Sequence, residues 1–391
     1  MRVLIAHNKY RGTGGELVIA QTQAELLRRK GNDVDVFFRS NDEIGEDVSE
    51  VSVPFRAFWA QDTATEFSKV VEEFQPDVLH VHNTWVLISP AIYWVAKEHD
   101  IAVVQTLHNY RLMCPMGRFL RNGEVCEKCL GKSFAYPGVV HQCYRNSRPQ
   151  TALAGGVVSA HWAVGTWKTK VDRYIVNTEF ARGKFIEGGL PEQKIAVKPN
   201  FVEDRGVGEE DNKFALFVGR ISEEKGLDIA IQAWRDAKIS IPLRIVGDGP
   251  MENEVSDSAS SLRNVEYLGR QSREEVVRLM KRASFLVFPS IWYEGMPMTI
   301  LEAFSVGLPV VASDLGAMST LVEHERTGLH FEPGNPSDLA TQVRRVIENP
   351  DELQSMSEGA RREYELHYTP ESNYDQLMQI YEEAIESTAT S

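Results

Sequence analysis

The sequence is poor in three features that would indicate other classes of protein. It has only four cysteines in 391 residues, and its 42 Lys and Arg are outnumbered by 56 Asp and Glu, a formal net charge of −14. An acidic chain is a poor candidate for general nucleic-acid binding, because basic surface drives that affinity. The longest uncharged stretch, residues 150–167, holds three glycines and a histidine, which favours a buried or interfacial helix over a membrane span. Residues 3–6 are too short for the apolar region of a signal peptide, so a cytoplasmic protein is expected.

The rest of the composition indicates a globular protein with an uneven charge. Hydrophobic residues make up 42% and charged residues 25% of the chain, and the length predicts two domains. Residues 101–184 carry 12 basic and 4 acidic side chains, whereas residues 199–391 carry 18 basic and 34 acidic ones. The basic stretch is either an ordinary solvated surface or one that meets an anionic molecule or an anionic membrane.

Short apolar runs alternate with helix-like segments along the chain, which predicts parallel α/β units. Strands are expected at residues 3–6, 34–38, 78–81, 103–107 and 174–176, and at 214–218, 243–246, 265–268, 285–288 and 310–312. The sequence therefore predicts two doubly wound parallel-sheet domains, residues 1–198 and 199–368, followed by an amphipathic helix at 369–391. Ligands bind at the carboxyl ends of such strands, so the expected active site is a cleft between two facing domains.

The loop after the strand at 285–288 has the features of an anion site. Pro297 suits the first turn of the helix expected at 298–305, and Gly295 lets the backbone approach a ligand closely. The amides at the start of that helix favour an anion such as phosphate.

Charged side chains accompany this loop. Glu302 stands among core-type residues, which favours a carboxylate that accepts two hydroxyls of a ribose over an ordinary exposed glutamate. Arg220 and Lys225 belong to the same edge of the sheet, where two cations would suit a diphosphate.

A set of motifs in fixed order carries a family resemblance. Glu294 and Glu302 stand within "EGMPMTILEA", which follows "FVGRISEEKG", "IVGDGP", "YLGR" and "FPS". The ordered set resembles the GT4 family of retaining glycosyltransferases, from "VLIAHNKYRGTGGELV" to the C-terminal helix. The resemblance implies the GT-B fold, with two Rossmann-like domains that face each other across a cleft. It also implies a nucleotide-sugar donor, most commonly a UDP-sugar in this family, held mainly by the second domain.

The resemblance gives each motif residue a role. It implies that Arg220 and Lys225 neutralise the diphosphate, that Glu302 binds the ribose, and that Glu294 binds the transferred sugar at the catalytic centre. It also implies that main-chain atoms near Arg270 meet the base, and that the C-terminal helix crosses back to the first domain. The backbone of the donor loop would bind the sugar and the phosphates through Gly295, Met296, Pro297, Met298 and Thr299.

The first half offers a glycine loop and three histidines. The loop at residues 11–16 has the spacing G-x-G-G and not the G-x-G-x-x-G of a dinucleotide site. The resemblance implies that Gly14 and Gly15 close over the diphosphate and the acceptor. It also implies that His108, which follows a strand, orients the donor sugar or helps at the reaction centre, although a lone histidine is more often structural. His80 and His82 are weaker candidates for the acceptor side.

All four cysteines fall in an irregular insertion at about residues 111–148. They are Cys114, Cys126, Cys129 and Cys143. A C-x2-C pair with two flanking thiols fits a structural zinc site, which would replace the core that the insertion lacks. Reduced or disulfide-bonded cysteines and an iron–sulfur centre are the alternatives. Four thiolates leave no open position, so no catalytic metal is expected, and the insertion is expected to shape the acceptor site.

The sequence therefore predicts a retaining glycosyltransferase that moves a sugar from a nucleotide-diphosphate-sugar to an acceptor hydroxyl, in polysaccharide, glycolipid or other glycoconjugate biosynthesis. The acceptor is a glycan, a lipid-linked molecule or a small molecule, and no nucleic acid is expected. Peripheral contact with the inner face of a membrane stays open. The alternatives are a nucleotide-sugar epimerase on the same fold, an NAD-dependent oxidoreductase and a zinc-dependent nucleic-acid-binding protein.

Overall fold

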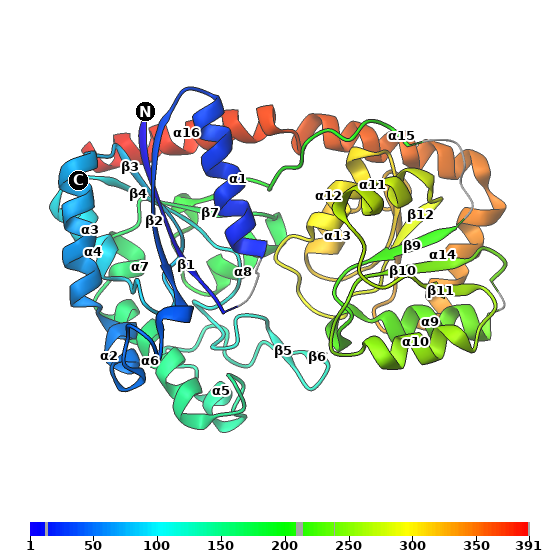
Figure 1. Ribbon diagram of the computed structural model, residues 1–391, viewed down its shortest axis with the longest axis horizontal. Coiled ribbons are helices and arrows are strands. Elements are labelled where there is room, and N and C mark those ends of the chain that lie inside the picture. The colour runs from blue at the N-terminus through cyan, green and yellow to red at the C-terminus, as the bar shows by residue number, and fades with distance from the viewer. Residues whose placement is uncertain (12–14, 209–213, 238, 390–391) are drawn as a thin grey trace. The chain divides into compact units, whose positions relative to one another are not determined.

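The computed structural model describes residues 1–11, 15–208, 214–237 and 239–389 (Figure 1). Contacts divide the chain into two units. Unit 1 comprises Met1–Phe119, Cys126–Lys198 and Tyr374–Ser391, and unit 2 comprises Leu120–Val125 and Pro199–Asn373. None of the helices within the described ranges is long and apolar enough to cross a membrane.

Unit 1 is built on a parallel six-stranded sheet in the order β2-β1-β3-β4-β7-β8. Its strands are β1 (Arg2–Lys9), β2 (Asp33–Ser40), β3 (Val78–Asn83), β4 (Ala102–Thr106), β7 (Arg173–Val176) and β8 (Ile195–Val197). All residues of β3 and β4 are buried, because both faces of the sheet are covered. The direction in which strands are added changes between β1 and β3, and the carboxyl ends of such neighbours are the usual ligand site.

Helices complete unit 1. They are α1 (Gly15–Arg29), α2 (Val53–Phe58), α3 (Gln61–Phe74), α4 (Ala91–Glu98), α5 (Tyr136–Val140), α6 (Arg148–Ala163), α7 (Thr166–Thr169) and α8 (Glu179–Glu187), with 3-10 turns η1 (Asn41–Glu43), η2 (Glu50–Ser52) and η3 (Glu192–Lys194). The last helix, α16 (Pro370–Ala389), belongs to unit 1 from Tyr374 onward. Its residues Leu377 and Tyr381 are fully buried against Val3, Val78 and other sheet residues, so its apolar stripe forms part of this core.

Unit 2 repeats the plan with the sheet order β11-β10-β9-β12-β13-β14. Its strands are β9 (Ala215–Val218), β10 (Leu243–Val246), β11 (Val265–Tyr267), β12 (Phe285–Phe288), β13 (Val310–Ser313) and β14 (Gly328–Phe331). Successive side chains of one strand enter different cores: Ala215 and Phe217 pack in one, and Leu216 packs in the other. This alternation explains the unbroken apolar runs of the sequence. The strand order changes direction between β9 and β12.

The helices of unit 2 cover both faces. They are α9 (Leu227–Asp236), α10 (Glu252–Ser260), α11 (Arg273–Arg282), α12 (Met298–Ser305), α13 (Ala317–Leu321), α14 (Pro336–Glu348) and α15 (Pro350–His367), with a 3-10 turn η4 (Glu223–Lys225). A short antiparallel hairpin, β5 (Leu120–Arg121) and β6 (Glu124–Val125), is grouped with unit 2.

All ten predicted strands are present, and the bounds of β10 and β12 match the prediction at both ends. Four strands were not predicted: the two-residue strands β5 and β6 of the hairpin, and β8 and β14 of the two large sheets. β8 has three residues between two lysines, and β14 begins with Gly328 and contains a histidine, so neither gives an apolar run. Gly328 is required there because a Cβ at this position would lie 1.9 Å from the carbonyl oxygen of Val310.

Candidate active site

An ion pair stands at the point of unit 2 where the strand order changes direction. Lys225, in the loop after β9, places its Nζ 2.7 Å from Oε1 of Glu294, in the loop after β12. The same oxygen accepts hydrogen bonds from Ser290 Oγ (2.8 Å) and from Trp292 Nε1 (2.9 Å). Glu294 is 6% exposed, so its carboxylate is fixed among three donors in a mostly buried position.

Backbone contacts hold these two loops against each other. Gly226 has a φ of +63°, and a Cβ there would lie 2.1 Å from the carbonyl oxygen of Pro289. Next to it, the carbonyl oxygen of Glu224 accepts hydrogen bonds from Ile291 N (3.0 Å) and Ser290 Oγ (3.1 Å). The close approach that only glycine permits therefore positions Lys225 beside Glu294.

The start of α12 has the character of an anion site. Pro297 is its N-cap, no side chain of the described chain caps it, and its first turn carries no acidic residue. Its first-turn N–H groups therefore favour a negative charge. Gly295, Pro297, Met298 and Thr299 lie along this turn and the loop before it, while Met296 Sδ accepts a hydrogen bond from Asn200 N (3.1 Å).

The remaining donor candidates of unit 2 differ in their surroundings. Burial raises the pKa of Glu302 on α12, and the nearby Arg273 and Arg205 partly oppose that shift. Arg220, which follows β9, is exposed and has no ion pair or hydrogen bond within the described residues. Arg270 is also exposed, with its Nη1 3.4 Å from Asp248 Oδ2. Sequence reasoning did not single out Arg205 or Arg273.

The predicted glycine loop is only partly described. Gly14 lies outside the described residues, and Gly15 is the exposed first residue of α1.

Histidines gather at the carboxyl edge of the sheet of unit 1. His108 Nε2 lies 2.8 Å from His82 Nδ1, and their rings stack with centroids 5.1 Å apart. His80 contacts Tyr381 Oη (2.7 Å) and Thr106 Oγ1 (2.8 Å) instead. Burial lowers the pKa of His108 to about 3 and that of His82 well below its usual range. Both imidazoles are therefore neutral at pH 7, and the pair shares one hydrogen bond without charge.

A cavity of about 60 Å³ opens next to this pair, within unit 1. Its lining comes from β3, β4, the loops after both strands, and helices α2, α6 and α7; it includes His82, His108, Trp85, Gln105 and Arg111. Both His82 Nε2 and Gln105 Oε1 are buried without a hydrogen-bond partner in the described chain. Such unpaired polar atoms in a cavity are what a polar ligand would satisfy.

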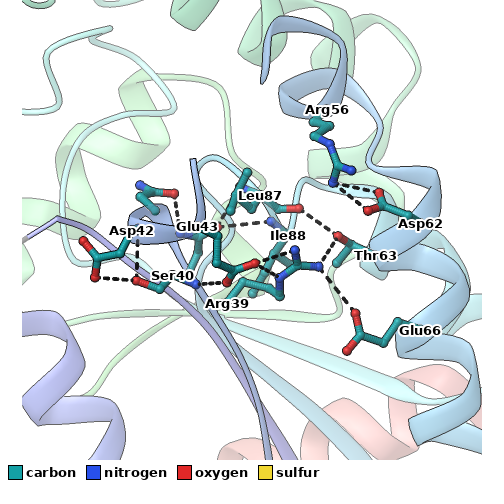
Figure 2. Close-up of polar contacts among 12 residues, drawn as sticks. Arg39, Ser40, Asp42, Glu43, Arg56, Asp62, Thr63, Glu66, Leu87 and Ile88 are labelled. Atoms are coloured by element: carbon teal, nitrogen blue, oxygen red, sulfur yellow. Dashed lines mark hydrogen bonds and ion pairs between the residues drawn. The ribbon is translucent and has the colours of Figure 1, made fainter. Parts of the chain in front are cut away.

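The loop after β3 is held rigidly from several sides. Asn8 Oδ1 accepts hydrogen bonds from Leu87 N (2.7 Å) and Ile88 N (3.1 Å). Figure 2 shows a second support, in which Arg39 donates to Glu43 Oε2 from Nε (2.8 Å) and Nη2 (2.6 Å). Arg39 also donates to Thr63 Oγ1 (3.1 Å), which donates in turn to Leu87 O (3.1 Å). The network fixes the loop that carries Trp85 into the cavity lining.

Arg111 is a cavity residue that sequence reasoning did not identify. Its guanidinium lies over the rings of Trp85 (5.2 Å) and Tyr144 (5.3 Å), and its Nη1 donates to Pro115 O (3.0 Å). The one available signal was its place three residues after His108 at a strand end. Nearby, Glu16 Oε1 accepts a hydrogen bond from Asn109 Nδ2 (2.8 Å), and burial raises the pKa of Glu16.

The four cysteines form no disulfide in the described chain. Burial raises the pKa of Cys129 to about 11, and Cys114, Cys143 and Cys126 add to that shift as neighbouring thiols. Within the described residues, however, no group of three or more His, Cys, Asp or Glu side chains is placed to hold a metal ion. The zinc site therefore stays a prediction.

Comparison with known proteins identifies the family. The model of the "Glycosyl transferase 4-like domain" matches residues 14–200, and that of "Glycosyl transferases group 1" matches residues 201–363. Glycogen synthase of Mycobacterium tuberculosis is 30% identical over 308 residues, 74% of this chain and 64% of that protein. An uncharacterized glycosyltransferase, MJ1178, of Methanocaldococcus jannaschii is 29% identical over 217 residues, 55% of this chain and 60% of that protein. The chain thus matches less than two thirds of the length of these curated relatives.

The fold has solved counterparts. The structure of Anabaena Alr3699/HepE in complex with UDP aligns with a TM-score of 0.69 at 17% identity, covering 97% of this chain and 99% of that one. At that identity the likeness concerns the fold, and it agrees with the two Rossmann-like units described above. The chain belongs to the group 1 glycosyl transferases with a glycosyl transferase 4-like first domain, and it has the GT-B fold.

Proposed function

We propose that this chain is a retaining glycosyltransferase that transfers a sugar from a UDP-sugar to an acceptor hydroxyl of a glycan, glycolipid or other glycoconjugate. The observation that carries the proposal is the Lys225–Glu294 pair beside the uncapped start of α12, where the strand order changes direction. A cation and helix amides suit a diphosphate, and a fixed carboxylate oxygen suits sugar hydroxyls. The relative Alr3699/HepE has been solved with UDP and with UDP-glucose, which supports UDP as the nucleotide.

The donor would be held by the residues of unit 2. Arg220, Lys225 and the first-turn amides of α12 would neutralise the diphosphate. Glu302 would accept the two ribose hydroxyls, a role that suits its half-buried place on α12. Main-chain atoms near Arg270 would meet the uracil ring.

The transfer would proceed on one face of the sugar. The bond from the anomeric carbon to the diphosphate oxygen breaks, and a bond to the acceptor oxygen forms on the same side. The proton of the acceptor hydroxyl passes to the departing diphosphate. The protein contributes position and electrostatic stabilisation of the leaving group, with fixed cations doing the work that a divalent metal ion does in other enzymes.

His108 would act as a neutral hydrogen-bonding group. Because burial lowers its pKa to about 3, it carries no proton to donate as an acid at pH 7. Its bond to His82 fixes the ring, so we assign it the task of orienting a sugar hydroxyl.

A structural zinc ion at Cys114, Cys126, Cys129 and Cys143 belongs to the proposal. The donor set fits in chemistry, since Cys114, Cys126 and Cys143 all contribute to the raised pKa of Cys129. When bound, the ion would stabilise the insertion and have no open position for catalysis.

A second partner is proposed for the surface formed by α5 and α6, which lie together in Figure 1. Residues 128–171 carry six Lys and Arg and no Asp or Glu. On α5, Tyr136 is 57% and Val140 58% exposed. Apolar side chains within a basic surface suit an anionic lipid bilayer.

Flotation with vesicles tests the lipid contact. We expect binding to phosphatidylcholine vesicles that contain phosphatidylglycerol, weaker binding without it, and loss of binding in Tyr136→Ser/Val140→Ser. The control is Leu366→Ser, an equally exposed apolar residue (58%) in unit 2. Equal binding by both variants would refute the lipid contact.

Thermal unfolding with UDP, GDP, ADP and NAD tests the donor proposal. A nucleotide at about 100 times its Kd adds about 2.7 kcal/mol to the free energy of unfolding. We expect the largest shift with UDP, a smaller one in Glu302→Gln, and an unchanged one in the control Glu348→Gln, an exposed glutamate of α14. A shift with NAD alone would refute the proposal in favour of an oxidoreductase, and inversion of the anomeric carbon in the product would refute retention.

A further inference from the structure

We propose that the cavity of unit 1 binds the carboxylate of an acidic sugar through Arg111, so that the acceptor is a uronic-acid-type sugar. This inference rests on the proposed function and names the class of acceptor. It follows from what lines the cavity, from the unused donors of Arg111 and from the rigidity of its surroundings.

Arg111 is the one charged residue in the lining. The other lining residues of this cavity are neutral, among them His82 and His108, whose pKa values are lowered by burial. Burial disfavours the charged form of Arg111, but the neighbouring Tyr10, Tyr144 and Glu16 outweigh it and raise the pKa, so the guanidinium keeps its charge. An anionic ligand would supply the ion-pair partner that this half-buried charge does not have within the described residues.

The Nε side of the Arg111 guanidinium has donor capacity left for a ligand. Nη1 donates to Pro115 O, whereas Nε is buried without a hydrogen-bond partner. The Tyr10 hydroxyl lies beside the guanidinium, and burial raises its pKa to about 12, so it is neutral and does not balance the charge of Arg111. Nε and Nη2 together form the planar pair of donors that matches the two oxygens of a carboxylate. A single planar pair and a cavity of about 60 Å³ suit a carboxylate better than a phosphate dianion.

The carboxylate of Glu16 does not take this place. It forms no ion pair with Arg111 within the described residues, and its Oε1 is bound by Asn109. Burial raises the pKa of Glu16, and its Oε2 has no partner in the described chain. Glu16 therefore reduces the positive charge near Arg111 only in part.

The guanidinium is held ready for a ligand. It lies over the rings of Trp85 and Tyr144, and Trp85 belongs to the loop fixed by Asn8 and by the Arg39 network (Figure 2). A fixed donor pair loses little freedom on binding. Two further unpaired atoms of the lining, His82 Nε2 and Gln105 Oε1, remain for the hydroxyls of the same sugar.

Saturation-transfer NMR on the full chain tests the inference without requiring transfer activity. The probes are 4-nitrophenyl β-D-glucuronide and 4-nitrophenyl β-D-glucoside, which differ in the carboxylate. We expect the glucuronide to bind at least tenfold more tightly, and Arg111→Gln to abolish the difference. The matched control is Arg145→Gln, because Arg145 also lies over the Tyr144 ring (5.4 Å) but does not line the cavity.

Two further measurements separate the possible failures. The thermal shift with UDP should be the same in Arg111→Gln and the wild type. If neither protein shows a UDP shift but the wild type still prefers the glucuronide, the proposed donor is refuted and this inference stands. Arg111→Lys, which keeps the charge but loses the planar donor pair, should retain a selectivity between those of the wild type and Arg111→Gln, and it serves if the latter fails to fold. The inference would be overturned if the two probes bound with equal affinity or if the Arg111 variants kept the selectivity of the wild type. It would also be overturned if glucose 6-phosphate bound more tightly than the glucuronide.

Discussion

Replacement of Lys225 by alanine should lower both the stability of unit 2 and its affinity for UDP. The Lys225 ammonium is 2.7 Å from Glu294 Oε1, and the Glu294 side chain is 8% exposed. Removing one partner of a fully buried pair costs about 3–5 kcal/mol, because the other charge stays buried. Lys225 is 20% exposed and two neutral donors remain on Glu294, so we expect a loss of about 1–3 kcal/mol in the free energy of unfolding.

The loss of UDP affinity has a separate origin. A hydrogen bond to a charged group contributes about 1.5–3 kcal/mol, which corresponds to a Kd about 10 to 150 times higher. Arg220→Ala is the control, because Arg220 is exposed and has no ion pair or hydrogen bond in the part of the chain that the structure describes. It should weaken UDP binding by a similar factor and leave the free energy of unfolding within about 0.5 kcal/mol of the wild type.

Urea unfolding and UDP titration of the two variants decide between a structural and a ligand-binding lysine. If Lys225→Ala lowers stability but leaves the Kd for UDP unchanged, the pair is structural and the diphosphate assignment is wrong. If stability is also unchanged, the argument from the buried Glu294 carboxylate fails as well. The double variant Lys225→Ala/Glu294→Gln should recover part of the lost stability, because the uncompensated charge is gone.

Three other perturbations test other parts of the molecule. Asn8→Ala removes the acceptor of two buried amides, so urea unfolding should show a loss of about 2–4 kcal/mol; a loss under 1 kcal/mol would contradict the assigned network. Burial lowers the pKa of His7 from 6.5 in the unfolded chain to about 4 in the folded one. The stability that the neutral ring contributes is therefore fully present above pH 6.5 and is lost as the pH falls toward 4, by at most about 3 kcal/mol of the free energy of unfolding. The urea midpoint of unfolding should fall between pH 7 and pH 5, and it should fall less in His7→Gln. Elemental analysis should find one zinc ion per chain. The variant Cys126→Ser should lose the zinc and part of the thermal stability but keep its affinity for UDP. A purified wild-type chain without zinc, as stable with a chelator as without it, would exclude the zinc site.

The fold was predictable because its determinants are local. Strands buried on both faces give short apolar runs, and Ala215–Val218 and Phe285–Phe288 show this in the letters of the sequence. The start of α12 was equally visible, since Gly295 and Pro297 are residues that such a turn requires. The two strands of the large sheets that were not predicted, β8 and β14, are held by neighbouring strands and not by their own hydrophobicity.

The contacts within the sites were not predictable in the same way. Lys225 and Glu294 were both identified, but as ligands of different groups of the donor. The bond between them joins residues 69 positions apart in the sequence, and it depends on the contact between Gly226 and Pro289. Arg111 escaped because its importance lies in what surrounds it, namely the two rings and the cavity. An arginine a few residues beyond a strand is common, and a sequence does not tell whether its donors are used.

The proposed donor site and the proposed lipid contact lie in parts of the chain with opposite net charge. Residues 199–391 carry 18 basic and 34 acidic side chains, yet the proposal assigns them an anionic donor. Charges more than about 8 Å apart are largely screened at physiological ionic strength, so UDP would depend on groups within contact distance, such as Lys225, Arg220 and the amides of α12. Because Glu294 holds Lys225 in place, this local positive charge is set before the donor arrives. Residues 128–171 have no acidic side chain, so at low ionic strength the attraction of the whole stretch to anionic lipid would add to the direct contacts. Added salt should therefore weaken the proposed lipid contact far more than UDP binding.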